Sequence, residues 1–240
     1  MITSLTNEFV KYLEKLKLKK YRDIENKFIV EGEHLVEEAI NSNRCEKVIV
    51  VDGYDYNTDI EKVVVTEEIM KKISLLDTPS KVIGLCNILE DSIIGNKVLI
   101  LDDIQDPGNL GTIIRSSLAF DVDTVILSNN TVDLYNPKVV RATQGMIFNI
   151  NVKRCELISF INELKNNNYI IYTTDVNDGV EAKNIEKTNK WALIMGNEGN
   201  GVSKEVANLA DKKININMNK NVESLNVGVA TGIILYELNN

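Results

Sequence analysis

The stretch LDDIQDPGNLGTIIRSSLAF, residues 101–120, decides how this chain folds. It begins at the end of an apolar run, turns at Asp106–Gly108, and then carries apolar residues at helical spacing. This pattern predicts a buried strand, a glycine-containing turn and a helix over Leu110–Phe120. A helix N-terminus after such a turn, with Arg115 close by, favours an anionic or polar ligand. An ordinary strand-to-helix turn with Arg115 on the surface explains this stretch equally well.

The alternation of strands and helices continues after this stretch. Strands are predicted at Val98–Asp102, Thr124–Leu127, Phe148–Val152, Tyr169–Thr173, Ala192–Met195 and Ile214–Met218. Besides the helix already named, helices are predicted at Pro137–Thr143, Cys155–Asn166, Ser203–Ala210 and Leu225–Leu238. The sequence therefore predicts an α/β fold with a mainly parallel sheet and helices on both faces. In such sheets, ligands bind beyond the carboxyl ends of the strands.

The residues before this stretch predict a smaller α/β unit. Helices are expected at Asn7–Lys20 and Gly32–Ser42, and strands at Lys27–Val30, Lys47–Val51, Val63–Thr66 and Lys81–Ile88. Thr66 is a candidate N-cap for a further helix. The polar segment Glu90–Asn96 separates the two parts, so the predicted domains are residues 1–90, a linker at 91–96, and residues 97–240.

Composition narrows the class of protein. The chain has 240 residues, no apolar run of membrane-spanning length, and a start without a signal-peptide pattern. Its three cysteines are scattered and it has one histidine, His34, so a metal site and Ser-His-Asp chemistry are not expected. These features favour a cytoplasmic protein without membrane contact.

Charge gives a mixed indication about nucleic acids. The formal net charge of −8 argues against non-specific coating of RNA or DNA. A basic run lies near the N-terminus and comprises Lys11, Lys15, Lys17, Lys19, Lys20, Arg22 and Lys27. A solvated helix face is the commoner fate of such a run, and RNA contact is the alternative.

Two more glycine-rich turns follow predicted strands, at Gly196–Gly201 and at Asn219–Asn226. The first lacks the GxGxxG spacing of a dinucleotide-binding loop, and taken alone it is typical of a tight surface turn. In the second, Ser224 could serve simply as the N-cap of the C-terminal helix. Small residues in that helix, such as Gly228 and Gly232, allow close packing either within the chain or on a second subunit.

Taken together, the three turns resemble a known family. DPGNLGTIIR, MGNEGNG and MNKNVESLNVGVA occur in the order of the three signature motifs of the SpoU (TrmH-like) RNA 2′-O-ribose methyltransferases of the SPOUT superfamily. Lys27–Ala39 and Asp77–Leu85 resemble the family's N-terminal substrate-binding domain, which is similar to a ribosomal L30e-type fold, and Arg141–Val152 resembles the segment between the first two motifs. Asn217 replaces a usual Pro and Asp121 a usual Gly, and local changes are expected there.

The resemblance implies a cofactor, a knot and a dimer. S-adenosylmethionine would lie in a C-terminal trefoil knot, lined by Met195, Gly196, Asn197, Gly201, Ile216 and Leu225. The active form would be a homodimer, in which Asn109 and Arg115 face a cofactor held by the other chain. Glu198, Ser224 and Asn226 would complete the catalytic set.

The implied reaction is methyl transfer to a ribose 2′-hydroxyl, most readily of ribosomal RNA. Transfer RNA as the substrate, a catalytically silent RNA-binding dimer, and a Rossmann-type enzyme with another nucleotide cofactor remain alternatives. Arg115 could act as a general base or as an electrostatic clamp, and Glu198 could pair with it or accept a hydrogen bond from the nucleoside. A guanidinium keeps its proton in proteins, which favours the clamp.

Overall fold

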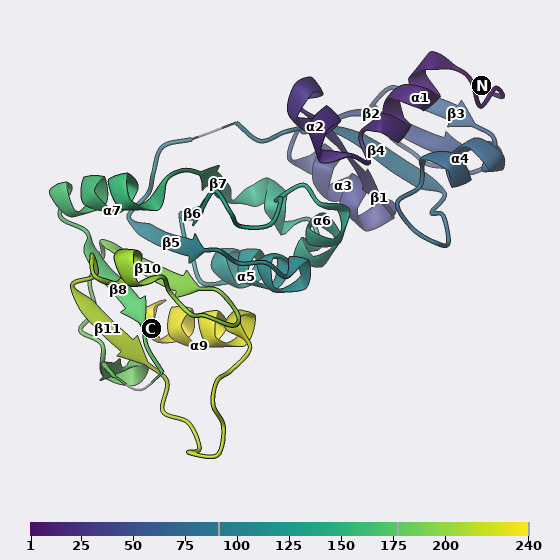
Figure 1. Cartoon of the computed structure of the whole chain (residues 1–240). Helices are drawn as coiled ribbons and strands as arrows, with labels where there is room; N and C mark the ends of the chain where they lie inside the picture. Colours follow the sequence, from purple (N-terminus) through teal and green to yellow (C-terminus); the bar gives the residue numbers. More distant parts are fainter. Residues whose placement is uncertain (91, 177, 240) are drawn as a thin grey trace. The chain divides into compact units, whose positions relative to one another are not determined.

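The computed structural model describes residues 1–90, 92–176 and 178–239 (Figure 1). Its contacts divide the chain into two compact units, Met1–Glu90 with Asp133–Asn149, and Asp91–Val132 with Ile150–Asn240. The first change of unit follows Glu90, while Asp91 itself lies outside the described residues. Asp133–Asn149, which the sequence assigns to the second domain, packs with the first unit.

The described part of the first unit contains a four-stranded sheet in the order β1-β4-β2-β3. Strand β4 pairs antiparallel with β1 and β2, and β2 pairs parallel with β3. The elements are α1 (Glu8–Lys15), α2 (Lys19–Glu25), β1 (Lys27–Glu31), α3 (Glu33–Asn41), β2 (Cys45–Val51), β3 (Lys62–Val65), α4 (Glu67–Ile73), β4 (Val82–Asn87), α6 (Pro137–Thr143) and the 3-10 helix η1 (Met146–Asn149).

Helices α1 and α4 share a core with the first sheet. Val10, Leu13 and Ile69 are fully buried against strand residues such as Ile49. Thr66 caps α4, as predicted, because its hydroxyl accepts a hydrogen bond from the N–H of Ile69 at 3.4 Å. The helix predicted at 7–20 was wrong in its extent: Leu18 is extended, so two helices form instead of one.

Most of the basic run is engaged within the first unit. Buried Arg22 donates to the carbonyls of Leu16 and Lys17 and pairs with Asp133 at 2.5 Å. Lys11, Lys19 and Lys27 pair with Glu8, Asp23 and Glu46, respectively, and Lys17 donates to the carbonyl of Lys72 at 2.6 Å. The run therefore serves largely to hold α1 and α2 in place.

In the second unit, the described strands form a seven-stranded parallel sheet in the order β7-β6-β5-β10-β8-β11-β9. This confirms the predicted α/β class. The elements are β5 (Lys97–Asp102), α5 (Pro107–Ala119), β6 (Thr124–Leu127), β7 (Asn151–Arg154), α7 (Leu157–Asn166), β8 (Ile170–Thr174), β9 (Val180–Glu181), η2 (Ala182–Asn184), β10 (Trp191–Gly196), α8 (Lys204–Ala207), β11 (Lys212–Asn215) and α9 (Val227–Asn239).

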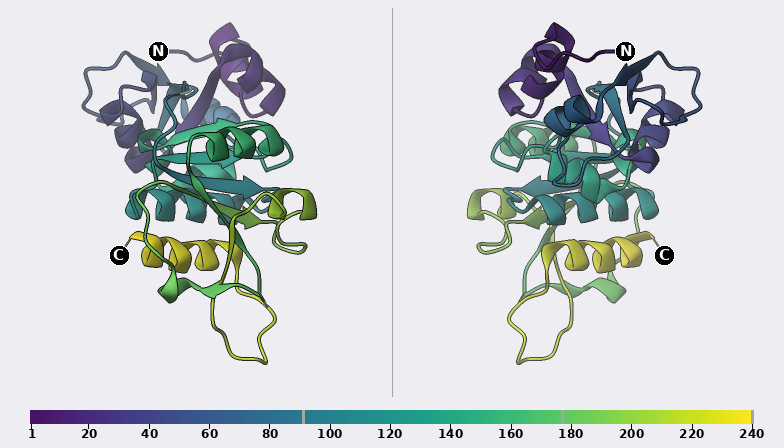
Figure 2. Two further views of the ribbon diagram at one scale, coloured as in Figure 1. Left: turned by 90° about the vertical axis from the view of Figure 1, so that its left-hand side faces the viewer. Right: turned by 90° about the vertical axis from the view of Figure 1, so that its right-hand side faces the viewer.

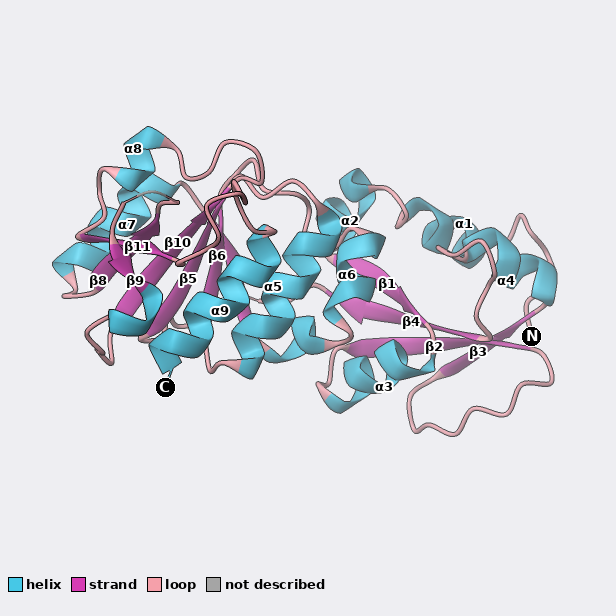
Figure 3. Cartoon of the chain, turned by 90° about the horizontal axis from the view of Figure 1, so that it is seen from below, coloured by secondary structure: helices cyan, strands magenta, loops and turns pink. Residues whose placement is uncertain are grey.

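Helices cover both faces of this sheet. Helices α7 and α8 pack with one set of strand side chains, which includes Val98 and Ile194. Helices α5 and α9 run side by side on the other face (Figures 2 and 3). A Cβ at Gly228 would lie 3.1 Å from Thr112, and one at Gly232 would lie 3.7 Å from Ser116. The small residues of α9 therefore face α5 of the same chain.

Two sequence features have clear counterparts here. Asp121, two residues after the end of α5, has a φ of 52°, the left-handed conformation that favours glycine. An aspartate tolerates this conformation better than most residues, so the departure from glycine remains local. Within residues 1–90, 92–176 and 178–239, no helix is long and apolar enough to cross a membrane, and no cluster of His, Cys, Asp and Glu could hold a metal ion.

Candidate functional site

The first two glycine-containing turns leave neighbouring strands of the parallel sheet. Strands β5 and β10 pair in register, with Gly196 beside Asp102 at their carboxyl ends. The Asn197 side-chain amide donates to the carbonyl of Asp103 at 2.8 Å, and the N–H of Ser203 donates to the Asp102 carboxylate at 2.8 Å. These bonds tie the two turns together at the edge where a parallel sheet binds ligands.

Glu198 lies at the N-terminus of α5. Its carboxylate accepts hydrogen bonds from the backbone N–H groups of Gln105 at 3.2 Å and Asp106 at 3.0 Å, and from the Asn109 side-chain amide at 3.0 Å. A carboxylate in this place is also favoured by the helix dipole. Among the residues that the structure describes, Glu198 forms no ion pair with Arg115, which was one of its two predicted roles.

Asn109 connects this carboxylate to the third turn. Its side-chain oxygen accepts a hydrogen bond from the Asn226 amide at 2.8 Å. The Asn226 oxygen caps α9, because it accepts from the N–H groups of Gly228 at 2.9 Å and Val229 at 3.3 Å. The simple explanation of Ser224 as the N-cap is therefore wrong. The bonded series Asn226, Asn109 and Glu198 unites the starts of α5 and α9.

Arg115 is exposed on α5 and has no hydrogen bond or ion pair to any residue that the structure describes. The predicted catalytic set thus divides into three bonded side chains, the exposed Ser224, and an Arg115 whose donors remain available. Such donors suit a bound phosphate or a developing negative charge.

A cavity of about 320 Å³ lies beside the second and third of these turns. All six predicted cofactor residues line it, as do Glu198 and Ser224 of the catalytic set. Apolar side chains such as Val227 and Ile234 form part of its wall, while glycines of the turn 196–201 contribute backbone rather than side chains to the lining. An apolar wall with a few backbone polar groups suits a flat adenine ring and the polar atoms of a nucleoside.

The cavity also includes residues that sequence reasoning missed. Thr174, Asp175 and Val176 line it from the end of β8, the strand beside β10. No motif marks these residues. The parallel-sheet rule could have identified them, but only with the order of the strands known, because the carboxyl ends of adjacent parallel strands meet at one edge.

The ionisation of Glu198 follows from its contacts. Partial desolvation would raise the pKa of its carboxyl group, but the hydrogen bonds from Asn109, Asp106 and Gln105 outweigh this and lower the pKa below the usual 4.5. Glu198 is therefore an ionised acceptor at neutral pH and a poor choice for a general base.

We expect Glu198→Gln to reduce the free energy of unfolding by about 1 kcal/mol at pH 7, because an amide cannot accept all three bonds and the site is exposed. The lowered pKa means that the wild-type advantage is present above pH 4.5 and is lost as the pH falls through the lowered value. Urea unfolding at pH 7 and pH 3 measures this. Glu205→Gln is the matched control, since Glu205 is exposed and makes no hydrogen bond with a described residue. Equal losses in both variants would contradict the assignment.

The comparisons with known proteins agree with this geometry. The profile described as "SpoU rRNA Methylase family" matches residues 96–236, and that described as "MRM3-like substrate binding domain" matches residues 7–84. The chain is 37% identical to the 23S rRNA (guanosine(2553)-2'-O)-methyltransferase RlmP of Bacillus subtilis, over 99% of this chain and 98% of that protein.

Two solved structures are similar over nearly their whole length. An AdoMet-bound rRNA methyltransferase from Sinorhizobium meliloti has a TM-score of 0.86 and 30% identity, covering 99% of this chain and 96% of that one. A TrmH-family RNA methyltransferase structure from Porphyromonas gingivalis has a TM-score of 0.87 and 29% identity, covering 98% of both chains. With three ordered motifs joined through Glu198, Asn109 and Asn226 and matches of this extent, the chain belongs to the SpoU rRNA methylase family.

Proposed function

We propose that this protein transfers a methyl group from S-adenosylmethionine to a ribose 2′-hydroxyl of ribosomal RNA, in the cytoplasm. The observation that carries the proposal is the cavity beside Glu198, which the second and third motif turns line with every predicted cofactor residue, while Glu198 bonds to the first turn. The relative from Bacillus subtilis is named for 2′-O-methylation of 23S rRNA, and the relative from Sinorhizobium meliloti is described as AdoMet-bound. The first relative supports ribosomal RNA as the substrate, and the second supports S-adenosylmethionine as the methyl donor.

The cavity residues would hold the cofactor mainly through backbone groups. Met195, Gly196, Asn197 and Gly201 present the β10 turn, and Ile216 and Leu225 present the segment before α9. S-adenosylmethionine, when bound, supplies an electrophilic methyl group on its sulfonium. The trefoil knot implied by the family is part of this proposal.

The chain's own residues would position the hydroxyl and stabilise its charge. Asn109 and Asn226 hold each other in place, and the ionised Glu198 fixes Asn109 from the other side. Ser224 lines the cavity, and its hydroxyl would form a hydrogen bond with the ribose. Arg115 would hold the phosphate beside the reacting ribose and stabilise the developing alkoxide. Fixed positions for both reactants supply much of the rate enhancement.

A homodimer is part of the proposal, and α9 carries its surface. Val229, Ile233 and Tyr236 fall on one face of the helix and are 51%, 37% and 54% exposed, respectively. The other face, with Gly228 and Gly232, already packs on α5. An exposed apolar stripe of this kind is typical of a subunit interface.

We expect the wild-type protein to be a dimer at micromolar concentration and Val229→Arg/Ile233→Arg to be a monomer, because burying two guanidinium groups in an apolar interface is costly. Methyl transfer should be lost with the dimer. Ile158→Arg is the matched control, since Ile158 on α7 is also 37% exposed. Analytical ultracentrifugation measures the oligomeric state of the wild-type protein and of both variants, and a methyl-transfer assay measures their activity. A wild-type monomer that methylates RNA would exclude a shared site.

The direct test is methyl transfer in vitro. We expect radioactive methyl groups from S-adenosylmethionine to enter a 23S rRNA transcript, at a nucleotide whose 2′-O-methylation then blocks alkaline cleavage. Transfer to a tRNA transcript with no transfer to 23S rRNA would show that the substrate is transfer RNA rather than ribosomal RNA. RNA binding without transfer to either RNA would indicate the silent RNA-binding dimer.

A further inference from the structure

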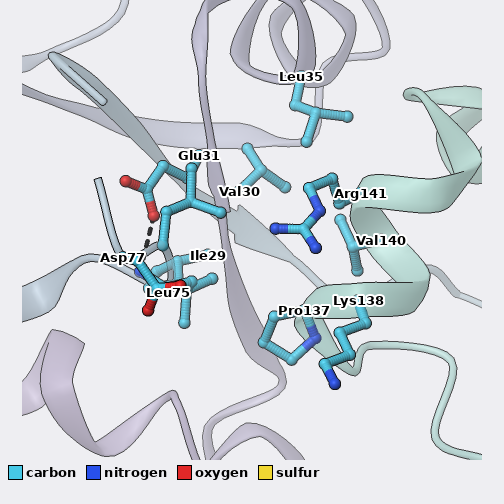
Figure 4. A pocket seen from close by; sticks show the side chains of 11 residues that line it. Ile29, Val30, Glu31, Leu35, Leu75, Asp77, Pro137, Lys138, Val140 and Arg141 are labelled. Atoms are coloured by element: carbon cyan, nitrogen blue, oxygen red, sulfur yellow. Dashed lines mark hydrogen bonds between the residues drawn. The ribbon is translucent and has the colours of Figure 1, made fainter. Parts of the chain in front are cut away.

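The first unit contains a cavity of its own, about 230 Å³ in volume (Figure 4). Its walls are β1, the segment Leu75–Asp77 and helix α6. Apolar residues of the lining include Ile29, Val30 and Val140. The volume suits one flat ring system of nucleobase size rather than a bare ion, and the lining combines these apolar side chains with polar ones.

Glu31 fixes the wall opposite α6. Its buried carboxylate accepts hydrogen bonds from the Ser74 hydroxyl at 2.7 Å, the N–H of Leu75 at 2.7 Å and the N–H of Ser80 at 2.9 Å. These bonds hold the segment 74–80 against β1. Glu31 therefore positions the wall, and its oxygens are already engaged.

Arg141 reaches from α6 across the mouth of the cavity (Figure 4). Its side chain is exposed and has no hydrogen bond or ion pair to any described residue. By contrast, the Arg22 and Arg154 guanidinium groups donate to backbone carbonyls. Lys138 lies one turn earlier on α6 and is also exposed and unpaired within the described chain. The mouth thus offers a planar fork of donors and a second positive charge.

Asp77 lines the wall opposite α6, and it too is exposed without a partner among the described residues (Figure 4). A free phosphate ion would gain from Arg141 and Lys138 but would be repelled by this carboxylate. A nucleotide satisfies both sides, because its phosphate is anionic and its base edge carries N–H donors. Unpaired bases are also the parts of RNA that proteins read with stacking and edge contacts.

We propose that this cavity holds one unpaired nucleotide of the RNA substrate. The phosphate binds Arg141 and Lys138, the base lies against the apolar wall, and Asp77 accepts a hydrogen bond from the base edge. This inference rests on the proposed function. It gains support from the matched substrate-binding profile, which includes β1 and the segment Leu75–Asp77.

The test compares RNA affinity among variants of the full-length protein, with a single-stranded RNA 12-mer of mixed sequence and the matching duplex as probes. We expect Arg141→Ala to weaken single-strand binding about 10-fold and to lower the salt dependence by about one phosphate contact. Duplex binding and S-adenosylmethionine affinity should not change. Arg44→Ala is the matched control, because Arg44 belongs to the same unit and does not line the cavity. Equal losses from Arg44→Ala and Arg141→Ala would overturn the site.

Asp77→Asn separates a nucleotide site from a simple anion site. Removal of the negative charge would strengthen binding at an anion site, whereas replacing a charged acceptor by a neutral amide oxygen weakens its hydrogen bond to a nucleotide. We expect a weakening of about 5-fold, equivalent to about 1 kcal/mol, the difference between a hydrogen bond to a charged group and one to a neutral group. Tighter binding by Asp77→Asn would overturn the proposal. Crosslinks from 4-thiouridine RNA should fall on Leu75–Asp77 or α6, and crosslinks confined to other elements would also contradict it.

Failure of the proposed function would give a different result from failure of the nucleotide pocket. In that case, the wild-type protein transfers no methyl group to any RNA. If the wild-type protein methylates 23S rRNA and Arg141→Ala does so with the KM of Arg44→Ala, only the nucleotide pocket is excluded.

Discussion

Gly196→Ala should reduce S-adenosylmethionine affinity about 100-fold, equivalent to about 2.7 kcal/mol. A Cβ at this position would lie 2.1 Å from both the backbone carbon of Gly201 and the backbone nitrogen of Val202. Real Cβ atoms do not approach this closely, and neither neighbour is a flexible side chain. The turn 196–201, which lines the cavity, must therefore move, and overpacking of this kind typically costs 1–3 kcal/mol or more.

Isothermal titration calorimetry measures the affinity, and a thermal unfolding curve shows whether the variant is folded. Gly199→Ala is the matched control in the same turn, because its Cβ would meet only the Asn197 side-chain oxygen at 3.6 Å. We expect that variant to bind like the wild-type protein. If folded Gly196→Ala bound the cofactor as tightly as Gly199→Ala, the cavity beside Glu198 would not be the cofactor site.

Elements with strong local signals are predictable from the sequence. The strand Thr124–Leu127 and the helix Pro137–Thr143 have the predicted bounds. In the helix, Asn136 accepts a hydrogen bond from the N–H of Lys138, and Pro137 occupies the first helical position. Such caps act within a few residues, so a local pattern contains all the information that is needed.

Elements that depend on distant pairing are not predictable in this way. Strand β9, Val180–Glu181, has only two residues and exists because it pairs with β11. A 3-10 helix at Met146–Asn149 takes up the first two residues of the strand predicted at Phe148–Val152, and β7 starts only at Asn151. The start of α9 is also not decided by the sequence alone, because Ser224 and Asn226 are both good N-cap residues. Burial of Val227 and Gly228, the latter against α5, accompanies the start of the helix after Asn226.

The site shows the same limit. The three motifs identify Asn109, Glu198 and Asn226, but their mutual bonds require that β10 lie beside β5 and α9 beside α5. No local pattern gives the order of strands in a sheet. The order also explains why Glu198 meets the start of α5 rather than Arg115, which lies further along that helix.

Arg115→Ala should lower turnover by about 100-fold to 1000-fold, the usual effect of removing one electrostatic donor from a transition state. S-adenosylmethionine affinity should barely change, because the cofactor would be held by the turns between Gly196 and Leu225, which line the cavity without Arg115 of the same chain. Arg115→Lys keeps the positive charge but loses the planar fork, so it should retain measurable transfer with reduced turnover. Single-turnover methyl transfer with a 23S rRNA transcript measures these rates, and Arg44→Ala controls for loss of a charge alone.

The pH dependence of Arg115→Lys decides between the two roles of Arg115. As a clamp, the side chain only needs a positive charge, so the pH–rate profiles of Arg115→Lys and the wild-type enzyme should run parallel below the range in which lysine titrates. As a general base, it must lose a proton, and lysine loses one more readily than arginine. The rate of Arg115→Lys would then rise with pH along a lysine titration that the wild-type profile lacks. Such a rising limb would exclude the clamp. Because Arg115 has no carboxylate partner among the described residues that could take its proton, we expect parallel profiles.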